Sequence, residues 1–151
     1  MKAKFSPLQL LDFKLLESHY EFIIPKDDEL DPKELFGAYH VEIDFDMSPI
    51  DENGEVQLVT LIEVNLGGES IDAGYKIMVE GGGTFKLNET EEIAEGLKNN
   101  LLKFSTLNMM INNLRNIIYQ ITNLGPMGGY LLPPIDITKL LNDKAEEQES
   151  E

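Results

Sequence analysis

The first half of the chain alternates hydrophobic and polar side chains every second residue, the period of a β-strand with one buried face. Residues 39–47 show it most clearly, because Val41, Ile43 and Phe45 alternate with acidic side chains. Three further stretches, rich in β-branched and aromatic residues, have a similar character; they cover residues 19–24, 56–68 and 74–87. The pattern therefore predicts four strands.

The last of these stretches carries three consecutive glycines in its interior, Gly81 to Gly83. Glycine has no side chain to pack, so a run of glycines inside a strand marks a bulge or a place where other atoms come close. We expect one of the two here.

From residue 93 the hydrophobic period changes to three or four residues, which predicts a long helix. Asn88 with Glu91 resembles a capping box at its start, and Gly125 followed by Pro126 ends it. The main apolar stripe comprises residues 93, 97, 101, 104, 107, 111, 114, 118 and 121, and a second stripe comprises Met109, Met110, Ile117 and Leu124. A helix apolar on two sides needs cover on two sides. The sheet of the same chain can cover one side of the helix. The other side is covered either by another subunit or by the core of a monomer.

A short apolar loop follows the helix between two proline-containing turns, and it contains Tyr130, Leu131 and Leu132. Asp136 can then cap a short last helix, since Asp is a preferred residue at the N-cap. The apolar side chains of that helix are Ile137, Leu140 and Leu141.

The order of elements predicts an α+β fold with one domain over residues 1–142. Strands followed by helices, without strand–helix alternation, favour a four-stranded antiparallel sheet, then a long helix, a Pro/Gly-rich loop and a short C-terminal helix. Residues 143–151 carry one apolar side chain, Ala145, and are predicted to form an acidic disordered tail.

The charge narrows the range of partners. The chain of 151 residues has 28 acidic and 12 basic side chains, a formal net charge of −16. This argues against binding nucleic acid through its phosphates, which needs clustered Lys and Arg. It is compatible with a basic protein partner, a decoy that mimics DNA, or a role in solubility. The chain has no cysteine and no apolar run long enough to span a membrane, and we expect a cytoplasmic protein.

Few residues point to catalysis or to a metal. His19 and His40 are the only histidines, and no metal-ligand spacing surrounds them. The sequence therefore predicts neither an enzyme, nor a cofactor, nor a metal site. The acidic side chains Glu42, Asp44 and Asp46 share one face of their strand, which is either solvated or a docking surface for a basic partner.

Apolar side chains in two loops are the stronger functional signal. They are Phe36 and Tyr39 in the connection after the first strand, and Tyr130, Leu131, Leu132 and Ile135 between the two helices. Loops keep such residues when they bind something or when they pack on the core of their own domain. Both interpretations stay open at this point.

The run from residue 108 to residue 141 resembles the C-terminal half of the SecB export chaperones. Asn108 opens the helix, Arg115 follows about two turns later, and Gly125 closes it. The segment "LPPIDI" of residues 132–137 matches the signature that leads into the last helix of that family. Upstream, "VEGGGTF" resembles the family's fourth strand and "VEIDFD" its acidic second strand, so the resemblance covers roughly residues 20–141.

The resemblance implies a homotetramer, built as a dimer of dimers, that binds unfolded polypeptides without ATP and keeps them export-competent or unaggregated. It implies a groove for these clients lined by Phe36, Tyr39, Tyr130, Leu131, Leu132 and Ile135. It also implies that the long helices pack between two sheet layers, with Met109, Met110, Arg115 and Ile117 at the interface between subunits.

The same resemblance implies docking on the SecA motor through acidic positions of the first and fourth strands. Lys76 and Met78 stand at the fourth-strand positions, which disfavours that docking, while Glu42, Asp44 and Asp46 keep the face acidic. Two alternatives stay open. One is an adaptor of SecB fold dedicated to a single partner such as an antitoxin, and the other is an acidic decoy of a nucleic-acid-binding protein.

Overall fold

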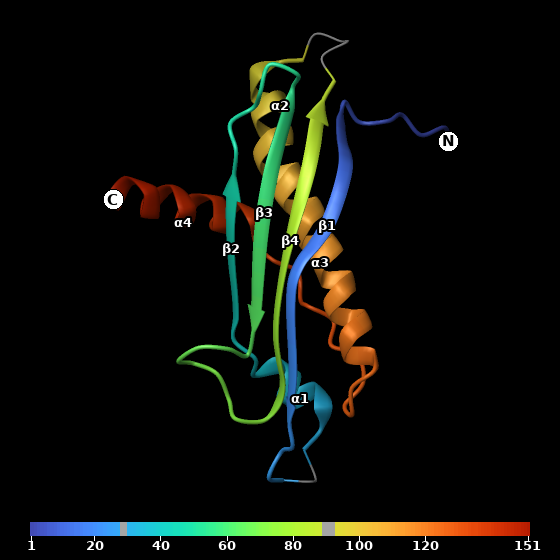
Figure 1. Ribbon diagram of the computed structural model, residues 1–151, viewed down its shortest axis with the longest axis vertical. Helices are drawn as coiled ribbons and strands as arrows, with labels where there is room; N and C mark the ends of the chain where they lie inside the picture. The colour runs from blue at the N-terminus through green and yellow to red at the C-terminus, as the bar shows by residue number, and fades with distance from the viewer. Residues whose placement is uncertain (28–29, 89–92) are drawn as a thin grey trace.

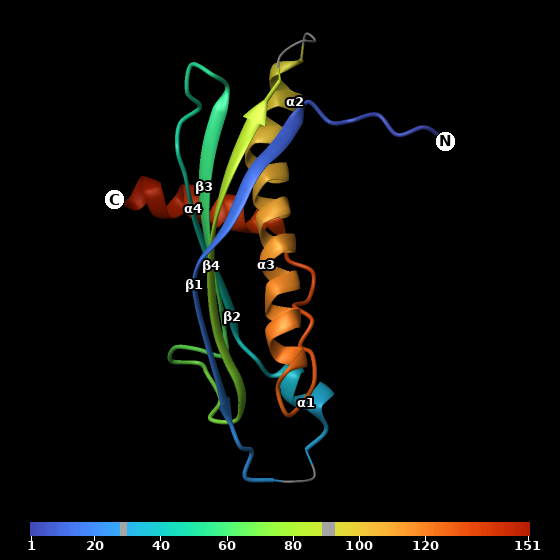
Figure 2. The ribbon, with the colours of Figure 1, turned by 45° about the vertical axis from the view of Figure 1, so that its right-hand side comes forward.

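The computed structural model describes residues 1–27, 30–88 and 93–151, and it has the predicted α+β architecture. A four-stranded antiparallel sheet in the order β1-β4-β3-β2 carries a long helical rod across one of its faces (Figures 1 and 2). The elements are β1 (Leu8–Ile23), α1 (Pro32–Gly37), β2 (Val41–Met47), β3 (Glu55–Val64), β4 (Gly74–Leu87), α2 (Glu95–Asn100), the π-helical turn η1 (Leu101–Ser105), α3 (Thr106–Asn123) and α4 (Ile137–Ser150).

The core lies between the sheet and α3. Alternate residues of β4 such as Tyr75, Ile77 and Val79 are fully buried, while the residues between them are only partly buried on the opposite, open face. The buried face of α3 consists mainly of Leu107, Met110, Ile111, Leu114 and Ile118. Each large apolar side chain buried in this way stabilises the fold by about 1.5–3 kcal/mol.

The glycine run in β4 lets α3 approach the sheet. A Cβ atom on Gly83 would lie 2.5 Å from the Met110 sulfur, and one on Gly81 would lie 3.0 Å from a Leu114 methyl carbon. The prediction of a close approach is thereby confirmed. The irregularities in this pair of strands lie in β1, on either side of the three residues that pair with the glycines.

β1 extends much further toward the N-terminus than the alternation predicts, because it begins at Leu8 instead of near residue 19. Its register against β4 shifts between Leu10 and Asp12 and again between Leu15 and Glu17. Each extra residue reverses the faces of the strand, so the simple two-residue period is lost from the sequence.

The helix has one buried face instead of two. Met110 packs on the sheet, whereas Leu124 is 91% exposed and Met109 and Ile117 are half-buried. The outward side of α3 carries the exposed polar residues Asn108, Asn112, Asn116 and Gln120. The expected second apolar stripe is therefore wrong as a continuous face. Of the predicted capping box, Glu91 lies outside the described residues.

α4 is longer than expected. The helix begins after Asp136, whose side chain accepts a hydrogen bond from the Lys139 backbone N–H, and it continues to Ser150. Residues 143–150 are therefore helical, and the prediction of disorder there was wrong. Lys139 pairs with Asp143 one turn later at 2.6 Å, which supports the helix in an otherwise acidic stretch.

Candidate polypeptide-binding groove

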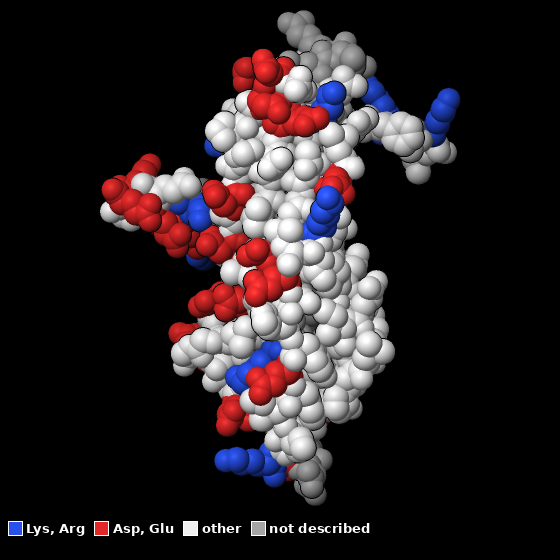
Figure 3. Space-filling view, viewed as in Figure 1, with Lys and Arg blue, Asp and Glu red and all other residues white. Residues whose placement is uncertain are grey.

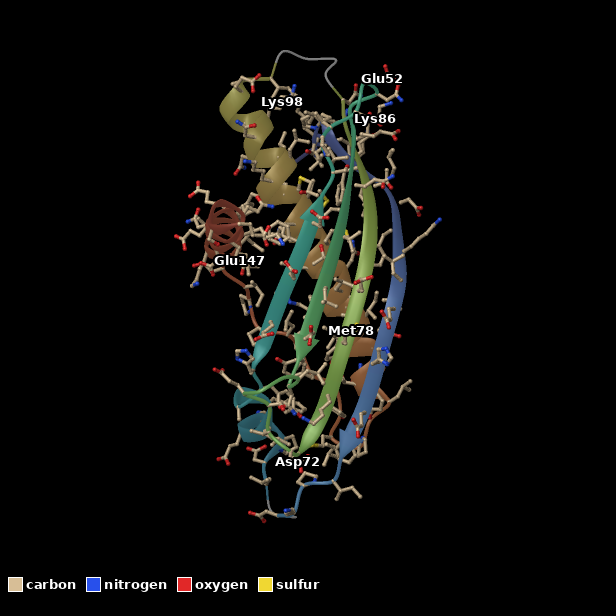
Figure 4. All side chains as sticks on the ribbon, turned by 60° about the vertical axis from the view of Figure 1, so that its left-hand side comes forward. Glu52, Asp72, Met78, Lys86, Lys98 and Glu147 are labelled. Atoms are coloured by element: carbon tan, nitrogen blue, oxygen red, sulfur yellow. The ribbon has the colours of Figure 1, made fainter. Side chains whose placement is uncertain are left out.

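A groove of about 700 Å³ lies between β2 and α4. Because β2 is the last strand of the sheet, its outer side is a free edge, and α4 passes this edge nearly perpendicular to the strands (Figures 1 and 4). The groove is lined by His40, Val41, Glu42, Ile43, Asp44, Phe45, Leu61, Glu63, Lys139, Leu140, Asp143, Lys144 and Glu147. A second hollow of about 580 Å³ lies on the other side of Lys144, between α4 and the end of β2.

Hydrogen bonds at the two ends of β2 show which of its backbone groups are free to bind another chain. The Asn65 N–H donates to the His40 carbonyl at 2.8 Å, and the Ser48 N–H donates to the Gln57 carbonyl at 2.9 Å. In an antiparallel pair every second residue bonds to the neighbouring strand and the residues between point away from it. The even-numbered residues of β2 therefore bond to β3, and the odd-numbered residues direct their N–H and C=O groups outward.

These outward groups line the groove at Val41 and Ile43. The next outward N–H, that of Phe45, already donates to the carboxylate of Asp44 at 2.8 Å. An extended chain laid along the edge could therefore form main-chain hydrogen bonds at the first two positions, which is how peptides add to sheets.

Lys144 fixes α4 against the strand. Its ammonium donates to the Asp44 carboxylate at 2.8 Å and lies 5.7 Å from the centre of the Phe45 ring. The hydrogen bond from Lys144 lowers the pKa of Asp44, and the same bond raises the pKa of Lys144.

The groove has an apolar floor and an acidic rim. The apolar side chains of the floor are Val41, Ile43, Phe45 and Leu140, while Leu61 lies opposite Asp44 on the open face. The carboxylates are Glu42, Asp44, Glu63, Asp143 and Glu147. Both of its lysines are already paired, Lys139 with Asp143 and Lys144 with Asp44. The field inside the groove is therefore negative.

The loop residues expected to face outward gather instead into an aromatic cluster at the α1 end of the sheet. Tyr130 meets Phe36 and Tyr39 edge-on, with ring centroids 5.3 and 5.4 Å apart, and Phe36 stacks on Tyr75 at 5.8 Å. Tyr130 is only 2% exposed, and burial raises its pKa to about 12. Tyr39 is buried as well, and its hydroxyl accepts a hydrogen bond from the Tyr75 backbone N–H at 2.8 Å.

Three of the six predicted groove residues are thus part of the core. Tyr39, Tyr130 and Leu132 fill the space between α1, β4 and the end of α3, so the expectation that they face outward was wrong. Leu131 is 62% exposed, whereas Phe36 and Ile135 are half-buried. The side chains of the loop alternate between the core and the surface, and only the outer ones can contact a partner.

Arg115 ties the loop to α3. Its guanidinium donates to the Leu132 carbonyl at 2.9 Å and to the Pro133 carbonyl at 3.2 Å, and it also bonds to the Asn112 side chain. Arg115 therefore bonds to its own chain, and Met110 is buried against the sheet of its own chain.

The acidic alternation of β2 is present as predicted. Glu42, Asp44 and Asp46 are exposed on the open face of the sheet, where Glu42 lies opposite Glu63 of β3. Figure 3 shows acidic side chains gathered on the β2 side of the molecule and along α4. Like charges directly opposite each other destabilise a sheet, so this face carries a cost in stability.

The two histidines lie far apart, because β1 and β2 are the opposite edges of the sheet. His19 contacts Glu17 at 2.9 Å, and His40 contacts Glu42 at 3.0 Å and Glu69 at 3.2 Å. Within residues 1–27, 30–88 and 93–151, no three His, Asp or Glu side chains are placed to hold a metal. No helix in this part of the chain is long and apolar enough to cross a membrane.

Sequence reasoning missed α4 as one wall of the groove. The signals were present, since Lys139 and Asp143 are four residues apart and Leu140, Leu141 and Lys144 share a helical face. An acidic composition is typical of disorder, but the pair of Lys139 with Asp143 and the apolar face of the segment favour a helix here.

Comparison with models of known protein families and with curated protein sequences gives no match. Among solved structures, the chain is similar to a SecB-like chaperone of Mycobacterium tuberculosis in complex with a peptide from an antitoxin. The two chains are 14% identical, the match covers 85% of this chain and 91% of the other, and the TM-score is 0.57. A Streptococcus agalactiae protein of unknown function matches with 10% identity, 85% and 97% coverage, and a TM-score of 0.41.

The fold is therefore that of a SecB-like chaperone. The resemblance drawn from the helix and loop motifs is confirmed at the level of the fold, in a chain whose sequence has diverged widely from the M. tuberculosis protein.

Proposed function

We propose that this protein is an ATP-independent holdase that binds unfolded or precursor polypeptides and keeps them export-competent or unaggregated. The observation that carries the proposal is the groove between β2 and α4, which offers a free strand edge above an apolar floor. Main-chain hydrogen bonds to the edge are available to any extended chain, and apolar contact needs no particular sequence. No reaction is catalysed and no cofactor takes part.

The charge of the protein supports this role. A holdase must keep a complex that contains exposed apolar segments in solution, and a net charge of −16 repels neighbouring complexes. Five of the acidic residues line the groove, and Glu42, Asp44 and Asp46 are exposed along β2.

The proposed particle is a cytoplasmic homotetramer. Support comes from β1, a long free edge with Leu11, Leu15 and Leu16 exposed, because such an edge is a template for pairing with another chain. Two sheets joined edge to edge would form each dimer, and α3 would contribute its asparagine-rich outer side to the contact between dimers. Glu42, Asp44 and Asp46 form the docking face for a basic partner, and SecA is one candidate for that partner.

A dedicated adaptor is the second candidate. It is favoured by the similar fold of the M. tuberculosis chaperone, which was solved with a peptide from an antitoxin. An adaptor would use the same groove but would bind one partner instead of many.

Suppression of aggregation with several unrelated unfolded proteins separates these functions. A holdase protects many of them at comparable ratios of chaperone to client, and an adaptor protects only its partner. An acidic decoy protects none and competes with DNA for its target. Absence of protection for every client would contradict the proposal.

Leu131→Asp tests whether the loop between α3 and α4, which does not line the groove itself, adds a second contact surface for clients. Leu131 is exposed, so a charge there leaves the core intact while it removes apolar contact area. We expect client affinity to fall about ten-fold, since a buried leucine side chain is worth about 1.5–3 kcal/mol. The measurement is fluorescence anisotropy with a labelled unfolded client. Leu124→Asp is the matched control, because Leu124 is also exposed and follows the end of α3; equal effects of the two variants would remove Leu131 from the site.

A further inference from the structure

The first six residues of the chain are basic, whereas the chain as a whole is acidic. Lys2 and Lys4 alternate with Ala3 and Phe5, and residues 1–6 are exposed and belong to no strand or helix. Phe5 is 91% exposed. Figures 1 and 2 show this segment, here called the arm, leaving the body of the protein at the start of β1. The arm is a short extended chain, basic on one side and apolar on the other.

The groove beside β2 has the complementary pattern. Apolar Val41 and Ile43 alternate with acidic Glu42 and Asp44, so one side of the strand edge is apolar and the other is negative. A strand added to this edge places its own side chains alternately on the same two sides. Lysines two residues apart would then lie next to the carboxylates, and the alanine and phenylalanine would lie over the apolar floor.

Carboxylates are available there to receive the lysines. Glu63 and Glu147 line the groove, and neither side chain has a hydrogen-bonding partner in the described part of the chain. The two lysines of the groove itself are held by Asp143 and Asp44. Charge complementarity therefore favours a basic strand as the occupant.

The arm cannot reach the groove of its own chain. The register places Leu8 beside Leu87 and sets Ile43 level with Val79, about 27 Å further along β4. β1 and β2 are also separated by the width of the sheet, about 14 Å. From Leu8 back to Lys2 the chain spans at most about 20 Å. Only a second copy can supply an arm to this groove.

We infer that residues 2–5 of one copy bind as a short added strand in the groove between β2 and α4 of a second copy. The contact joins an exposed basic segment to a groove whose unpaired charges are acidic. It goes beyond the proposed function, because it describes how the groove is filled when no client is bound.

The test is photo-crosslinking between isotopically distinct copies. A benzophenone-bearing amino acid replaces Phe5 in unlabelled full-length protein, which is refolded together with ¹⁵N-labelled protein of natural sequence. After irradiation and proteolysis, mass spectrometry identifies the peptides joined. We expect crosslinks from the unlabelled arm to labelled peptides that contain residues 41–45 or 140–144. Crosslinks confined to unlabelled chains, crosslinks to other surfaces, or none at all would overturn the inference.

Reversing the charge of the two lysines in the arm tests the contact without altering the groove. Lys2→Glu with Lys4→Glu should lower the yield of these crosslinks about five-fold, since two attractive contacts become repulsive. Lys26→Glu with Lys33→Glu makes the same change in net charge at exposed positions away from the arm and should leave the yield unchanged. Equal yields in both variants would overturn the pairing of the arm with the acidic rim. Aggregation suppression measured on the same variants reports on the holdase function independently, because a failed crosslink leaves that result untouched.

Discussion

At the scale of single residues, α3 packs close to β4 because glycines at the contact have no Cβ atom. Gly83 lies under the Met110 sulfur, whereas Gly82, its neighbour, faces the open side of the sheet and would contact only Leu16 at 3.4 Å. Adjacent positions of one strand thus have opposite tolerance for a side chain.

Gly83→Ala should therefore lower the free energy of unfolding by about 2 kcal/mol, because the added methyl group overfills the core. Gly82→Ala should be neutral or slightly stabilising, since it restricts the unfolded chain without a clash. Urea unfolding followed by circular dichroism measures both. Similar losses in the two variants would show that α3 does not approach the sheet at this point.

The loop that follows β3 likewise depends on a single residue, Asn65. It is buried in a left-handed conformation with φ of 57°, and its amide bonds to Ile71, Ala73 and Tyr75 of the following loop and strand. Asparagine tolerates this conformation better than most residues. The sequence contained no sign of this role, because the partners are backbone groups whose positions exist only in the fold.

At the scale of elements, the contact of Lys144 with Asp44 links α4 to β2. Because the folded-state pKa of Asp44 is lowered, the contact stabilises the protein above the ordinary value of 3.8 and is lost as the pH falls through the lowered pKa. The pKa of Lys144 is raised, so the contact is also lost at the alkaline end, as the pH rises above 10.5 and through the raised value.

Asp44→Asn should lower the free energy of unfolding at neutral pH by less than about 1 kcal/mol, since the carboxylate is mostly exposed. The difference from the natural sequence should disappear below the lowered pKa of Asp44. Urea unfolding over a pH series measures it, and Asp46→Asn on the same strand is the control. A difference that stays constant down to strongly acidic pH would mean that the ion pair does not hold the helix.

The elements also show what the sequence could predict. β2, β3 and β4 were predicted because an unbroken two-residue period survives in strands with regular pairing. The first part of β1 was not, because its two register shifts break that period. The site was predicted only in part. Leu131 and the acidic side of β2 are exposed as expected, but burial of Tyr130 and Leu132 depends on how the loop folds back toward α1, which no local pattern encodes.

At the scale of the whole molecule, the two free edges of the sheet have different surroundings. β1 presents exposed leucines, whereas β2 is passed by α4 and surrounded by acidic side chains. Association through β1 alone would give closed, symmetric pairs, because the same edge would serve both copies.

Because the proposed tetramer also needs a contact between two such pairs through α3, light scattering should give a mass of four chains, each of 17.0 kDa. Leu11→Lys with Leu16→Lys should lower that mass while the circular dichroism spectrum is retained, since both side chains are exposed on the edge strand. Leu124→Lys, at a position that is even more exposed but outside the sheet, should leave the mass unchanged. A natural protein that is monomeric at micromolar concentration would contradict the tetramer.

The position of α4 across the β2 edge also affects how copies of the protein can assemble. If β1 of one molecule could pair with β2 of the next, every addition would expose a fresh β2, and the assembly would grow without limit into a ribbon. α4 crosses the β2 edge where Lys144 bonds to Asp44 and leaves only Val41 and Ile43 open to a short strand, so the C-terminal helix should prevent a full-length β1 from pairing there. A chain shortened before Ile137 should become turbid and bind amyloid dyes on standing, while the full-length chain stays clear.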